Sequence, residues 1–290
     1  MQVKNMERKA YCQYVCDSVD DSGTEALYVY LPIAGGFAQY SFVHAEIPAK
    51  QCDVWRMGPV FACDTNFQRK ARLTRAHAEW EMALRLQDRP DFIGGAAHGD
   101  EIGRGIVCWI DGKEIAVSGL YDMTPFETLS LSVDSIGYDP ASPSEAVLHH
   151  QKHFTIDAVQ VQVSQKVEWL QDVALSRSYM AMMPPLKEVT DCYRIGQSEY
   201  LPIAQRSFSE SGRFDWLTLR GADGFTFEMR VNRYLSENGE NTCLITDNGG
   251  DSYHKMYFVL AHGGQANQGD IWETETVYRI YRDEMSAIGS

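Results

Sequence analysis

The stretch Asp91–Glu101 combines one histidine and several carboxylates with small residues. It contains the run Gly94-Gly95-Ala96-Ala97-His98-Gly99-Asp100-Glu101. Small residues let a backbone approach a ligand closely, and a histidine in such a place is suited to act as a base. We predict that His98 and Glu101 are catalytic and that Asp100 contacts the substrate, with Asp100 or Glu101 setting the tautomer of His98. The alternative is a glycine-rich bulge with a surface histidine.

A second charged group follows the alternating run Arg75–Leu86. Alternate side chains of a strand share a face at a spacing of about 6.5–7 Å, so His77, Glu79 and Glu81 are expected to project together. We predict that Arg75, His77, Glu79 and Glu81 bind the substrate. Glu79 and Glu81 could instead form the acid–base pair of a glycoside hydrolase, or bind a divalent cation with His77. A solvated face with self-compensating charges is the remaining alternative.

Three histidines and a lysine fall within the five residues His149–His153. Together they predict a cationic patch at mildly acidic pH that would neutralise an acidic sugar, and we expect His150 and His153 to contact the substrate. A metal site is disfavoured because neighbouring residues of a strand point to opposite faces. The alternative is an exposed loop.

Lys255 and Tyr257 share one face of a short alternating run, opposite Met256 and Phe258. A lysine beside a tyrosine lowers the pKa of the phenol by stabilising the phenolate. We therefore predict that Tyr257 exchanges a proton with the substrate near neutral pH and that Lys255 is its catalytic partner. The alternative is an amphipathic strand with a solvent-facing lysine. The methionine-rich run Tyr179–Pro184 is interpreted as core filling.

Strands must position these groups, because period-two alternation dominates the chain. The alternating runs are Ala26–Leu31, Arg75–Leu86, Val159–Val167, Phe225–Asn232, Met256–Leu260 and Val277–Arg282. Asp111-Gly112 predicts a hairpin, and short helices are expected over Phe67–Arg75 and Ser144–His150. We predict an all-β antiparallel sandwich, or jelly roll, with a concave polar face and few short helices. One domain is expected over residues 1–290, with about 20 N-terminal residues as an extension.

The 290 residues carry a formal net charge of −14, with a pI near 5.0. This balance excludes a broad basic face and argues against nucleic acid or an anionic membrane as the main partner. A local cationic groove remains compatible with it. The oligomeric state is left open.

Seven cysteines, an odd and scattered set, favour free thiols over a disulfide framework. We expect no metal and no cofactor. The chain contains no apolar stretch of membrane-spanning length, and residues 1–11 lack the apolar core of a signal peptide. We therefore expect a soluble protein that is cytoplasmic or associated with a virion.

The segment Lys255–Phe258, followed by the polar loop Gly263–Gln268, resembles the C-terminal strand of jelly-roll polysaccharide lyases. That family has a Tyr-Phe-Lys type of strand followed by glycine, tyrosine or asparagine, and glutamine. The resemblance implies a tyrosine and a histidine on a concave sheet, and it carries over only to Tyr257 and Lys255. The pairs Trp80-Glu81 and Gly94-Gly95 and the run His98–Glu101 also look similar to bacteriophage tail proteins and their glycan-degrading appendages.

These observations favour a polysaccharide lyase that cleaves an acidic glycan by β-elimination. Tyr257 or His98 would remove the proton next to the carboxylate, and the other would protonate the leaving oxygen. Lys255 or an arginine would neutralise the carboxylate. The alternatives are a non-catalytic glycan-binding or virion tail protein, and a glycoside hydrolase that uses Glu79 and Glu81.

Overall fold

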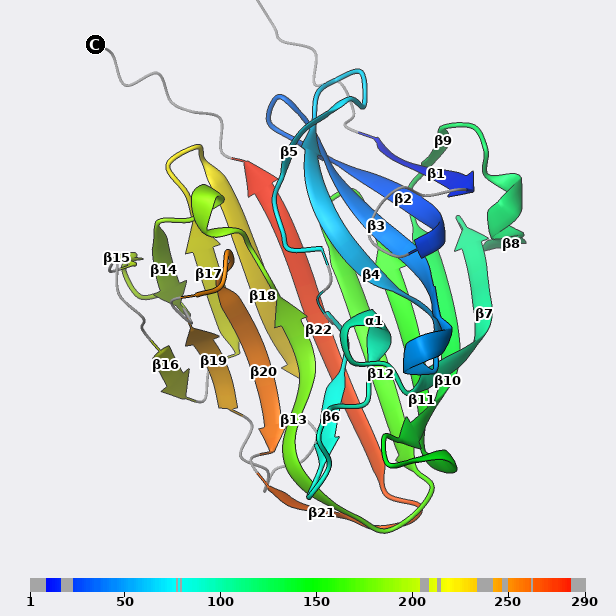
Figure 1. Cartoon of the computed structure of the whole chain (residues 1–290). Coiled ribbons are helices and arrows are strands. Elements are labelled where there is room, and N and C mark those ends of the chain that lie inside the picture. The colour runs from blue at the N-terminus through cyan, green and yellow to red at the C-terminus, as the bar shows by residue number, and fades with distance from the viewer. Residues whose placement is uncertain are drawn as a thin grey trace, which may run out of the picture.

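The computed structural model describes residues 9–16, 23–76, 78, 80–203, 209–212, 215–233, 242–246, 250–261 and 263–282. Most of these residues lie in strands of two sheets, and Figure 1 shows the smaller sheet in front of the larger one. The predicted all-β antiparallel sandwich is therefore confirmed. Among the described strands, the exception to antiparallel pairing is a two-residue contact between Cys52–Asp53 and Glu101–Ile102.

The larger sheet has 16 strands among the described residues. Its path runs through β15 (Leu201–Pro202), β14 (Cys192–Ile195), β17 (Trp216–Arg220), β18 (Phe225–Arg233), β22 (Ile271–Arg282), β12 (Val161–Trp169), β11 (Ser142–Ile156), β10 (Leu129–Asp139), β7 (Glu101–Ile110), β4 (Cys52–Cys63), β3 (Gly36–Ile47), β2 (Gly23–Ile33), β1 (Ala10–Cys16) and β9 (Thr124–Phe126). The short strands β5 (Arg69–Arg72) and β8 (Lys113–Ile115) pair with β4 and β7. The strand β22 comes late in the sequence, yet it lies in the middle of the sheet, between β18 and β12.

The smaller sheet consists of six strands among the described residues. They are β16 (Ser209–Gly212), β19 (Thr242–Thr246), β20 (Lys255–Ala261), β13 (Val173–Met183), β21 (Gly264–Ala266) and β6 (Ala83–Leu86), the last of which pairs with β13. One helical turn, α1 (Gly95–His98), and three 3-10 turns, at Pro48–Lys50, Val117–Gly119 and Lys187–Val189, complete the described elements.

The two sheets bury one continuous hydrophobic cluster between their inner faces. Alternation places Val161, Val163 and Val167 of β12 in this core, where side chains from the smaller sheet such as Phe258 join them. A separate aromatic cluster covers the outer face of β2–β4, around Tyr28, Tyr30 and Phe61. The strands near the N-terminus are therefore covered on both faces, and β1 lies within the stretch expected to be an extension.

The predicted hairpin at Asp111-Gly112 is confirmed. It joins β7 to β8, and both turn residues have positive φ, 50° and 79°, as a type I′ turn requires. The two predicted helices are wrong, because Arg69–Arg72 and Ser142–Ile156 pair as strands instead. The single-domain expectation stays a prediction.

The alternating run Arg75–Leu86 forms a strand only at its end, in β6. Before β6, the carbonyl of Trp80 accepts hydrogen bonds from the Met182 N–H and the Tyr278 hydroxyl. This segment is thus held by single contacts to both sheets rather than by a ladder to one. As a result Glu81 is buried along with Trp80 and Met82, against the alternation.

Six cysteines are free thiols in the described residues, and four of them are buried. Among the described residues there is also no helix long and apolar enough to cross a membrane.

Candidate functional site

A pocket of about 410 Å³ opens on the outer face of the smaller sheet, and we call it the aromatic pocket. It is lined by Arg75, Ala78, Glu81, Met82, Ala83, Arg85, Phe92, Ala97, His98, Arg177, Tyr179, Ala181, Met182, Tyr253, Lys255 and Tyr257. Five of the residues predicted from sequence therefore meet here, although they come from distant parts of the chain. They are Arg75, Glu81, His98, Lys255 and Tyr257.

Strand alternation explains which side chains reach this pocket. On β20, Met256 and Phe258 are buried in the core, so Lys255 and Tyr257 point outward, as the sequence predicts. On β13, Arg177 and Tyr179 also line the pocket. The pairing of β13 with both β20 and β6 brings these outward side chains side by side.

Aromatic rings form a continuous row along the pocket. Tyr257 stacks on Tyr179 with ring centroids 4.5 Å apart, and Tyr179 stacks on Phe92 at 5.7 Å. Phe92 then contacts the ring of His98 at 4.8 Å. His98 and Tyr257 thus stand at the two ends of one row, with two rings between them.

Basic side chains lie beside this row. Arg85 and Arg177 are direct cross-strand partners on β6 and β13, an arrangement of like charges that is normally unfavourable. Their guanidinium groups lie over the rings of Phe92 and Tyr179, at 5.7 and 5.2 Å. The Nε of Arg177 is buried and has no hydrogen-bond partner among the described residues. The site therefore concentrates positive charge that the neighbouring side chains do not neutralise.

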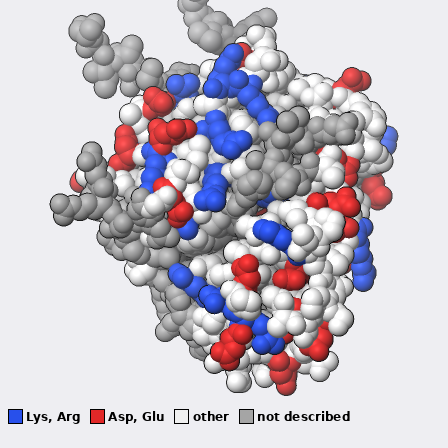
Figure 2. Space-filling view, viewed as in Figure 1, with Lys and Arg blue, Asp and Glu red and all other residues white. Residues whose placement is uncertain are grey.

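Lys255 and Arg75 occupy another side of the pocket, around the ring of Tyr253. Lys255 Nζ lies 2.9 Å from Asp251 Oδ2, whereas Arg75 Nη1 lies 3.9 Å from Asp251 Oδ1. One carboxylate therefore offsets part of their charge. Figure 2 shows Lys and Arg on this side of the molecule in separate groups with Asp and Glu between them, and no broad basic face appears in this view.

The prediction that Lys255 lowers the pKa of Tyr257 is wrong. Burial raises the pKa of Tyr257 well above its usual value, and the neighbouring Tyr179 and Tyr253 add to this effect. Burial favours a lower pKa for Lys255, but the interactions with Asp251 and Tyr253 together outweigh it and leave that pKa raised. Because burial raises the pKa of Tyr257, its phenol stays protonated near neutral pH.

A tight turn holds His98 at its end of the row. The Gly94 N–H donates to the Gly99 carbonyl at 2.9 Å, and α1 lies between these two glycines. A Cβ on Gly94 would approach the Met82 carbonyl oxygen to 2.3 Å, and the φ of Gly94 is +139°. Asp91 Oδ1 lies 2.7 Å from His98 Nδ1, so Asp91 sets the tautomer, rather than Asp100 or Glu101 as predicted.

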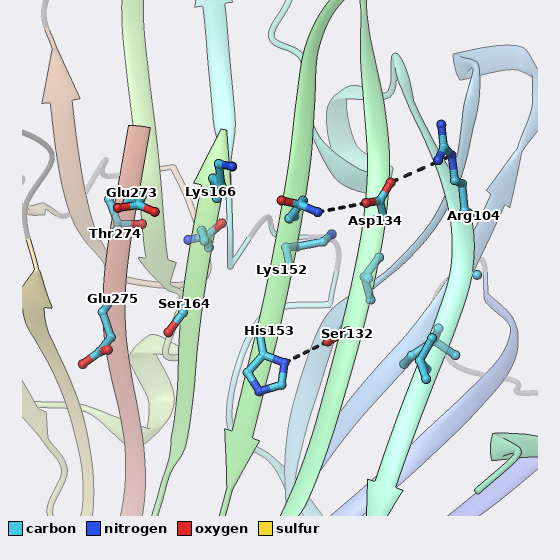
Figure 3. Close-up of a pocket in the computed structure, with 16 residues that line it drawn as sticks. Arg104, Ser132, Asp134, Lys152, His153, Ser164, Lys166, Glu273, Thr274 and Glu275 are labelled. Atoms are coloured by element: carbon cyan, nitrogen blue, oxygen red, sulfur yellow. Dashed lines mark hydrogen bonds and ion pairs between the residues drawn. The ribbon is translucent and has the colours of Figure 1, made fainter. Parts of the chain in front are cut away.

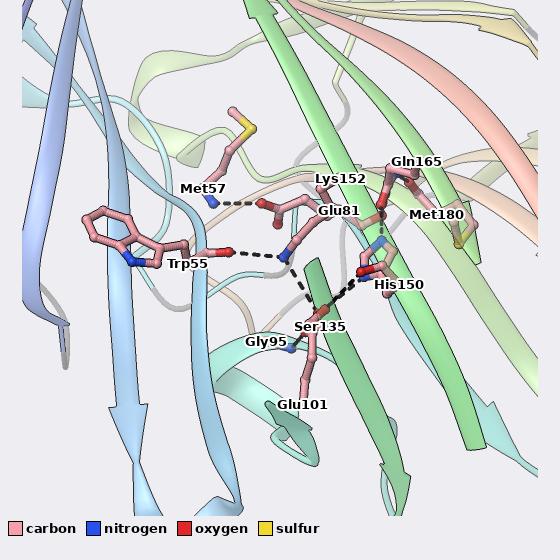
Figure 4. A network of polar contacts seen from close by, with 10 residues as sticks. All are labelled: Trp55, Met57, Glu81, Gly95, Glu101, Ser135, His150, Lys152, Gln165 and Met180. Atoms are coloured by element: carbon pink, nitrogen blue, oxygen red, sulfur yellow. Dashed lines mark hydrogen bonds and ion pairs between the residues drawn. The ribbon is translucent and has the colours of Figure 1, made fainter. Parts of the chain in front are cut away.

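Glu101 lies inside the sandwich, in what we call the buried network (Figure 4). Its Oε1 accepts a hydrogen bond from Ser135 Oγ at 2.7 Å and lies 3.2 Å from His150 Nδ1 and 3.6 Å from Lys152 Nζ. Its Oε2 accepts from the Gly95 N–H at 2.8 Å, at the start of the turn that carries His98. This placement contradicts the prediction that Glu101 and His150 face a substrate.

Charge partners explain why a carboxylate is stable at this depth. Burial alone would raise the pKa of Glu101, but Lys152, His150 and Ser135 outweigh it and hold that pKa far below its usual range. The network extends to the smaller sheet, because His150 Nε2 lies 3.0 Å from Gln165 Oε1 and the Gln165 amide donates to the Met180 carbonyl of β13. It thus ties the two sheets together.

Glu81 and Asp100 are only partly available to a ligand. Glu81 is only 4% exposed, and its Oε1 accepts a hydrogen bond from the Met57 N–H at 2.7 Å. Asp100 is half-buried, does not line the aromatic pocket, and has a pKa raised by burial. His77 and Glu79 lie outside the described residues, so the predicted roles of that pair stay predictions.

The outer face of the larger sheet carries a different hollow, of about 550 Å³, which we call the outer groove (Figure 3). Outward side chains of β7, β10, β11, β12 and β22 line it, including Arg104, Asp134, His153, Lys166 and Glu275. Its charges are mixed, and it matches the predicted polar face of a sheet.

The predicted cationic patch at His149–His153 does not form. Alternation on β11 buries His150 and Lys152, while His149 and His153 face outward. His149 pairs with Asp134 at 2.9 Å, and His153 contacts Ser132 in the outer groove at 2.8 Å. The structure therefore divides these four residues between the two faces of β11, and none of them lines the aromatic pocket.

Sequence reasoning missed Asp91, Phe92, Arg177, Tyr179 and Tyr253. A usable signal existed on β13, because Arg177 and Tyr179 alternate with the buried Ser178 and Met180. The methionines that follow drew the interpretation toward core filling. Those methionines are indeed buried, but the interpretation hid the outward tyrosine at the start of the run.

No protein-family model matches the chain, and no curated protein matches its sequence. Among solved structures it is similar to the GH36 alpha-galactosidase AgaB from Geobacillus stearothermophilus, at 9% identity and a TM-score of 0.52, over 88% of this chain and 40% of that chain. A glycoside hydrolase family 97 enzyme from Pseudoalteromonas matches at 6% identity and 0.48, over 90% and 37%. Heparan sulfate lyase HepC from Pedobacter heparinus matches at 8% and 0.43, over 94% and 37%.

The chain spans about two fifths of the length of these enzymes. At 9% identity the likeness to AgaB shows the fold alone: this β-architecture occurs as part of a carbohydrate-active enzyme. None of these comparisons bears on the bacteriophage tail prediction, which stays a prediction.

Proposed function

We propose that the protein binds an acidic polysaccharide in the aromatic pocket. The cross-strand pair Arg85–Arg177 beside the stacked row carries this proposal. Two like charges face each other there, and the buried Arg177 Nε lacks a partner among the described residues. A carboxylate or sulfate beside the two guanidinium groups would offset both charges.

The aromatic row accounts for the rest of the ligand. Phe92, Tyr179 and Tyr257 are partly exposed, and the edges of their stacked rings form an apolar strip that suits an extended chain of sugars. The occurrence of this fold within a carbohydrate-active enzyme agrees with such a ligand. The outer groove is lined by both acidic and basic side chains, whereas most charged side chains of the aromatic pocket are basic. The aromatic pocket is therefore the better match for a polymer that carries repeated negative charges.

The direct test measures binding to uronate polymers, heparin and a neutral glucan. We expect the acidic polymers to bind and the neutral one to bind weakly. Arg177→Gln should raise Kd about tenfold, because one charge-assisted hydrogen bond is lost. Lys70→Gln is the matched control, since Lys70 is exposed and pairs with Asp64 away from the pocket lining. Equal affinity of Arg177→Gln and wild type for the acidic polymers would contradict the proposal.

β-Elimination is the chemistry that the pocket supports best, and the contact of His98 with Asp91 favours it. The imidazole of His98 takes the proton from the carbon next to the carboxylate, which Arg85 and Arg177 neutralise. The electron pair of that C–H bond forms a carbon–carbon double bond as the bond to the leaving oxygen breaks. Tyr179, which lies nearer to His98 in the row than Tyr257 does and whose pKa is raised by burial, gives its proton to that oxygen.

Ultraviolet absorbance of unsaturated sugar ends tests the elimination separately from binding. We expect His98→Gln to lower the rate about 10²- to 10⁴-fold while affinity changes little. Tyr179→Phe and Tyr257→Phe keep the row but remove one hydroxyl each. Tyr179→Phe should slow the elimination, whereas Tyr257→Phe, at the far end of the row from His98, should not. Tight binding of every acidic polymer without any unsaturated product would leave a glycan-binding protein and end the lyase assignment.

A further inference from the structure

A second surface rich in arginine lies on the outer face of the larger sheet, where β14, β17, β18 and β22 are neighbours. The register places Trp216 opposite Arg230, Arg194 opposite Thr218, and Glu228 opposite Arg279. Leu217 and Leu219 alternate with these residues and lie in the core, so the arginines face outward. We call this surface the arginine patch, formed by Arg194, Arg220, Arg230 and Arg279.

Aromatic rings hold these guanidinium groups in place. The guanidinium of Arg230 lies 3.8 Å from the ring centre of Trp216, and that of Arg194 lies 5.2 Å from the same ring. Arg194 also lies 4.7 Å from the ring of Tyr200. Because the rings are engaged by arginines, guanidinium edges rather than ring faces meet an incoming ligand. Such edges donate paired hydrogen bonds to planar or tetrahedral oxyanions.

The charge of the patch is offset only in part. Glu228 is buried and lies 2.9 Å from Arg230 Nε and 3.3 Å from Arg279 Nη1. This single carboxylate cannot offset the charges of Arg194, Arg230 and Arg279 together. The side chains of Arg230 and Arg279 remain 39% and 32% exposed, so a ligand in solution can reach them. On a chain with a net charge of −14, this is a local site of the opposite sign.

We propose that the arginine patch binds the sulfate or carboxylate groups of an acidic glycan, as a second site apart from the aromatic pocket. The two sites lie on the outer faces of different sheets, so one can be lost without the other. The choice of a glycan rests on the proposed function, whereas anion binding rests on the patch itself.

The dimensions of the patch disfavour a nucleic-acid duplex. Four adjacent strands span about 14 Å, from three spacings of about 4.8 Å. Proteins that bind duplexes neutralise many phosphates over a broad basic surface, and the acidic body of this chain opposes such binding. A few closely spaced sulfates or carboxylates fit four guanidinium groups better.

The test titrates the whole chain with a heparin oligosaccharide and a uronate oligosaccharide by calorimetry. Arg194→Gln should weaken binding at the patch about tenfold. Arg194 contacts the rings of Tyr200 and Trp216, and its removal breaks no ion pair in the described part of the chain. Arg194→Lys keeps the charge but loses the planar fork, and it should recover part of the affinity. Arg104→Gln, which removes a 74% exposed arginine from the same face of the sheet, should change Kd less than about twofold.

Each other outcome overturns the inference in a different way. Equal binding by Arg194→Gln and wild type would mean that the patch holds no glycan. Loss of binding in Arg177→Gln alone would place the glycan in the aromatic pocket, which rejects the patch and leaves the proposed function standing. Displacement of heparin by an equal concentration of duplex DNA would reassign the patch to phosphate backbones. Circular dichroism of each variant confirms that it is folded.

Discussion

His98 and Glu101 are three residues apart in the chain, yet they serve two opposite regions. Glu101 enters the buried network, where Ser135, His150, Lys152 and the Gly95 N–H surround its two oxygens. His98 ends the aromatic pocket, where the arginines face rings and each other. Charged residues are thus paired with a carboxylate in one region, whereas Arg85 and Arg177 of the other lie over rings and face each other.

This difference shows that residue type alone does not locate a binding site. Burying an ion pair costs free energy of desolvation, and removing one partner of a buried pair costs still more stability. Such a pair is therefore part of the folded framework. Cations packed beside rings with few carboxylates keep hydrogen-bond capacity for a ligand. The predictions below test whether the two regions really divide between stability and binding.

The largest expected effect comes from Glu101→Gln. Removing the carboxylate leaves Lys152 buried without its charge partner, which should cost about 3–5 kcal/mol of the free energy of unfolding. Urea denaturation followed by circular dichroism measures this loss. His98→Ala in the pocket should stay within about 0.5 kcal/mol of wild type. Similar losses in both variants would erase the division between the regions.

The pH dependence of stability should separate the regions next. Because the folded-state pKa of Glu101 is lowered from an ordinary value of 4.5, its contribution is complete above about pH 4.5. As pH falls from there toward the folded pKa, the unfolded chain binds a proton that the folded chain does not, so stability falls. Each pKa unit of separation corresponds to about 1.4 kcal/mol.

Wild type should therefore lose stability more steeply than Glu101→Gln between about pH 4.5 and pH 2. Thermal melting across this range gives the two slopes. Parallel curves for the two proteins would show that Glu101 is not the group that titrates.

A smaller effect is expected on binding when the middle of the aromatic row is removed. Tyr179→Ala deletes the ring that stacks on both Tyr257 and Phe92, and it should weaken glycan binding about five- to tenfold. Tyr179→Phe keeps the ring and should bind as wild type does. Calorimetry with a uronate oligosaccharide distinguishes them, and unchanged affinity in the alanine variant would mean that the row is not a platform for sugars.

The smallest effect concerns the acidic residue at the pocket edge. Asp251→Asn removes the carboxylate that pairs with Lys255 and lies near Arg75, so acidic glycans should bind about two- to threefold more tightly. The gain should shrink as salt is added, because the charges are partly exposed. Asp64→Asn, which frees Lys70 away from the pocket lining, should leave affinity unchanged. Weaker binding in Asp251→Asn would contradict a cationic role for Lys255.

Local patterns were enough to predict the all-β fold and several of its strands. The alternation of Lys255 and Tyr257 with Met256 and Phe258 gave the correct outward face of β20, because a half-buried strand has period two. The turn chemistry of Asp111-Gly112 was equally local. In each case neighbouring residues alone determine the outcome.

Pairing between distant segments decided what the sequence could not predict. The burial of Glu101 depends on Lys152 and His150 of β11, which a local pattern cannot reveal. The aromatic row depends on β13 lying between β20 and β6. The residues before β6 alternate in sequence but are held between the two sheets, so they do not form the strand with one charged face that the alternation predicts.

The position of β22 in the larger sheet has a consequence for how the chain is made. The ribosome releases β12 and β18 before Ile271–Arg282 emerges. Until β22 is inserted between them, each of these two strands has one unpaired edge. A nascent chain that reaches only Asp270 therefore holds two partial sheets with exposed edges, a state prone to pairing with other chains. Completion of the sandwich thus requires the synthesis of β22, and truncation before β22 should yield aggregates rather than a smaller folded protein.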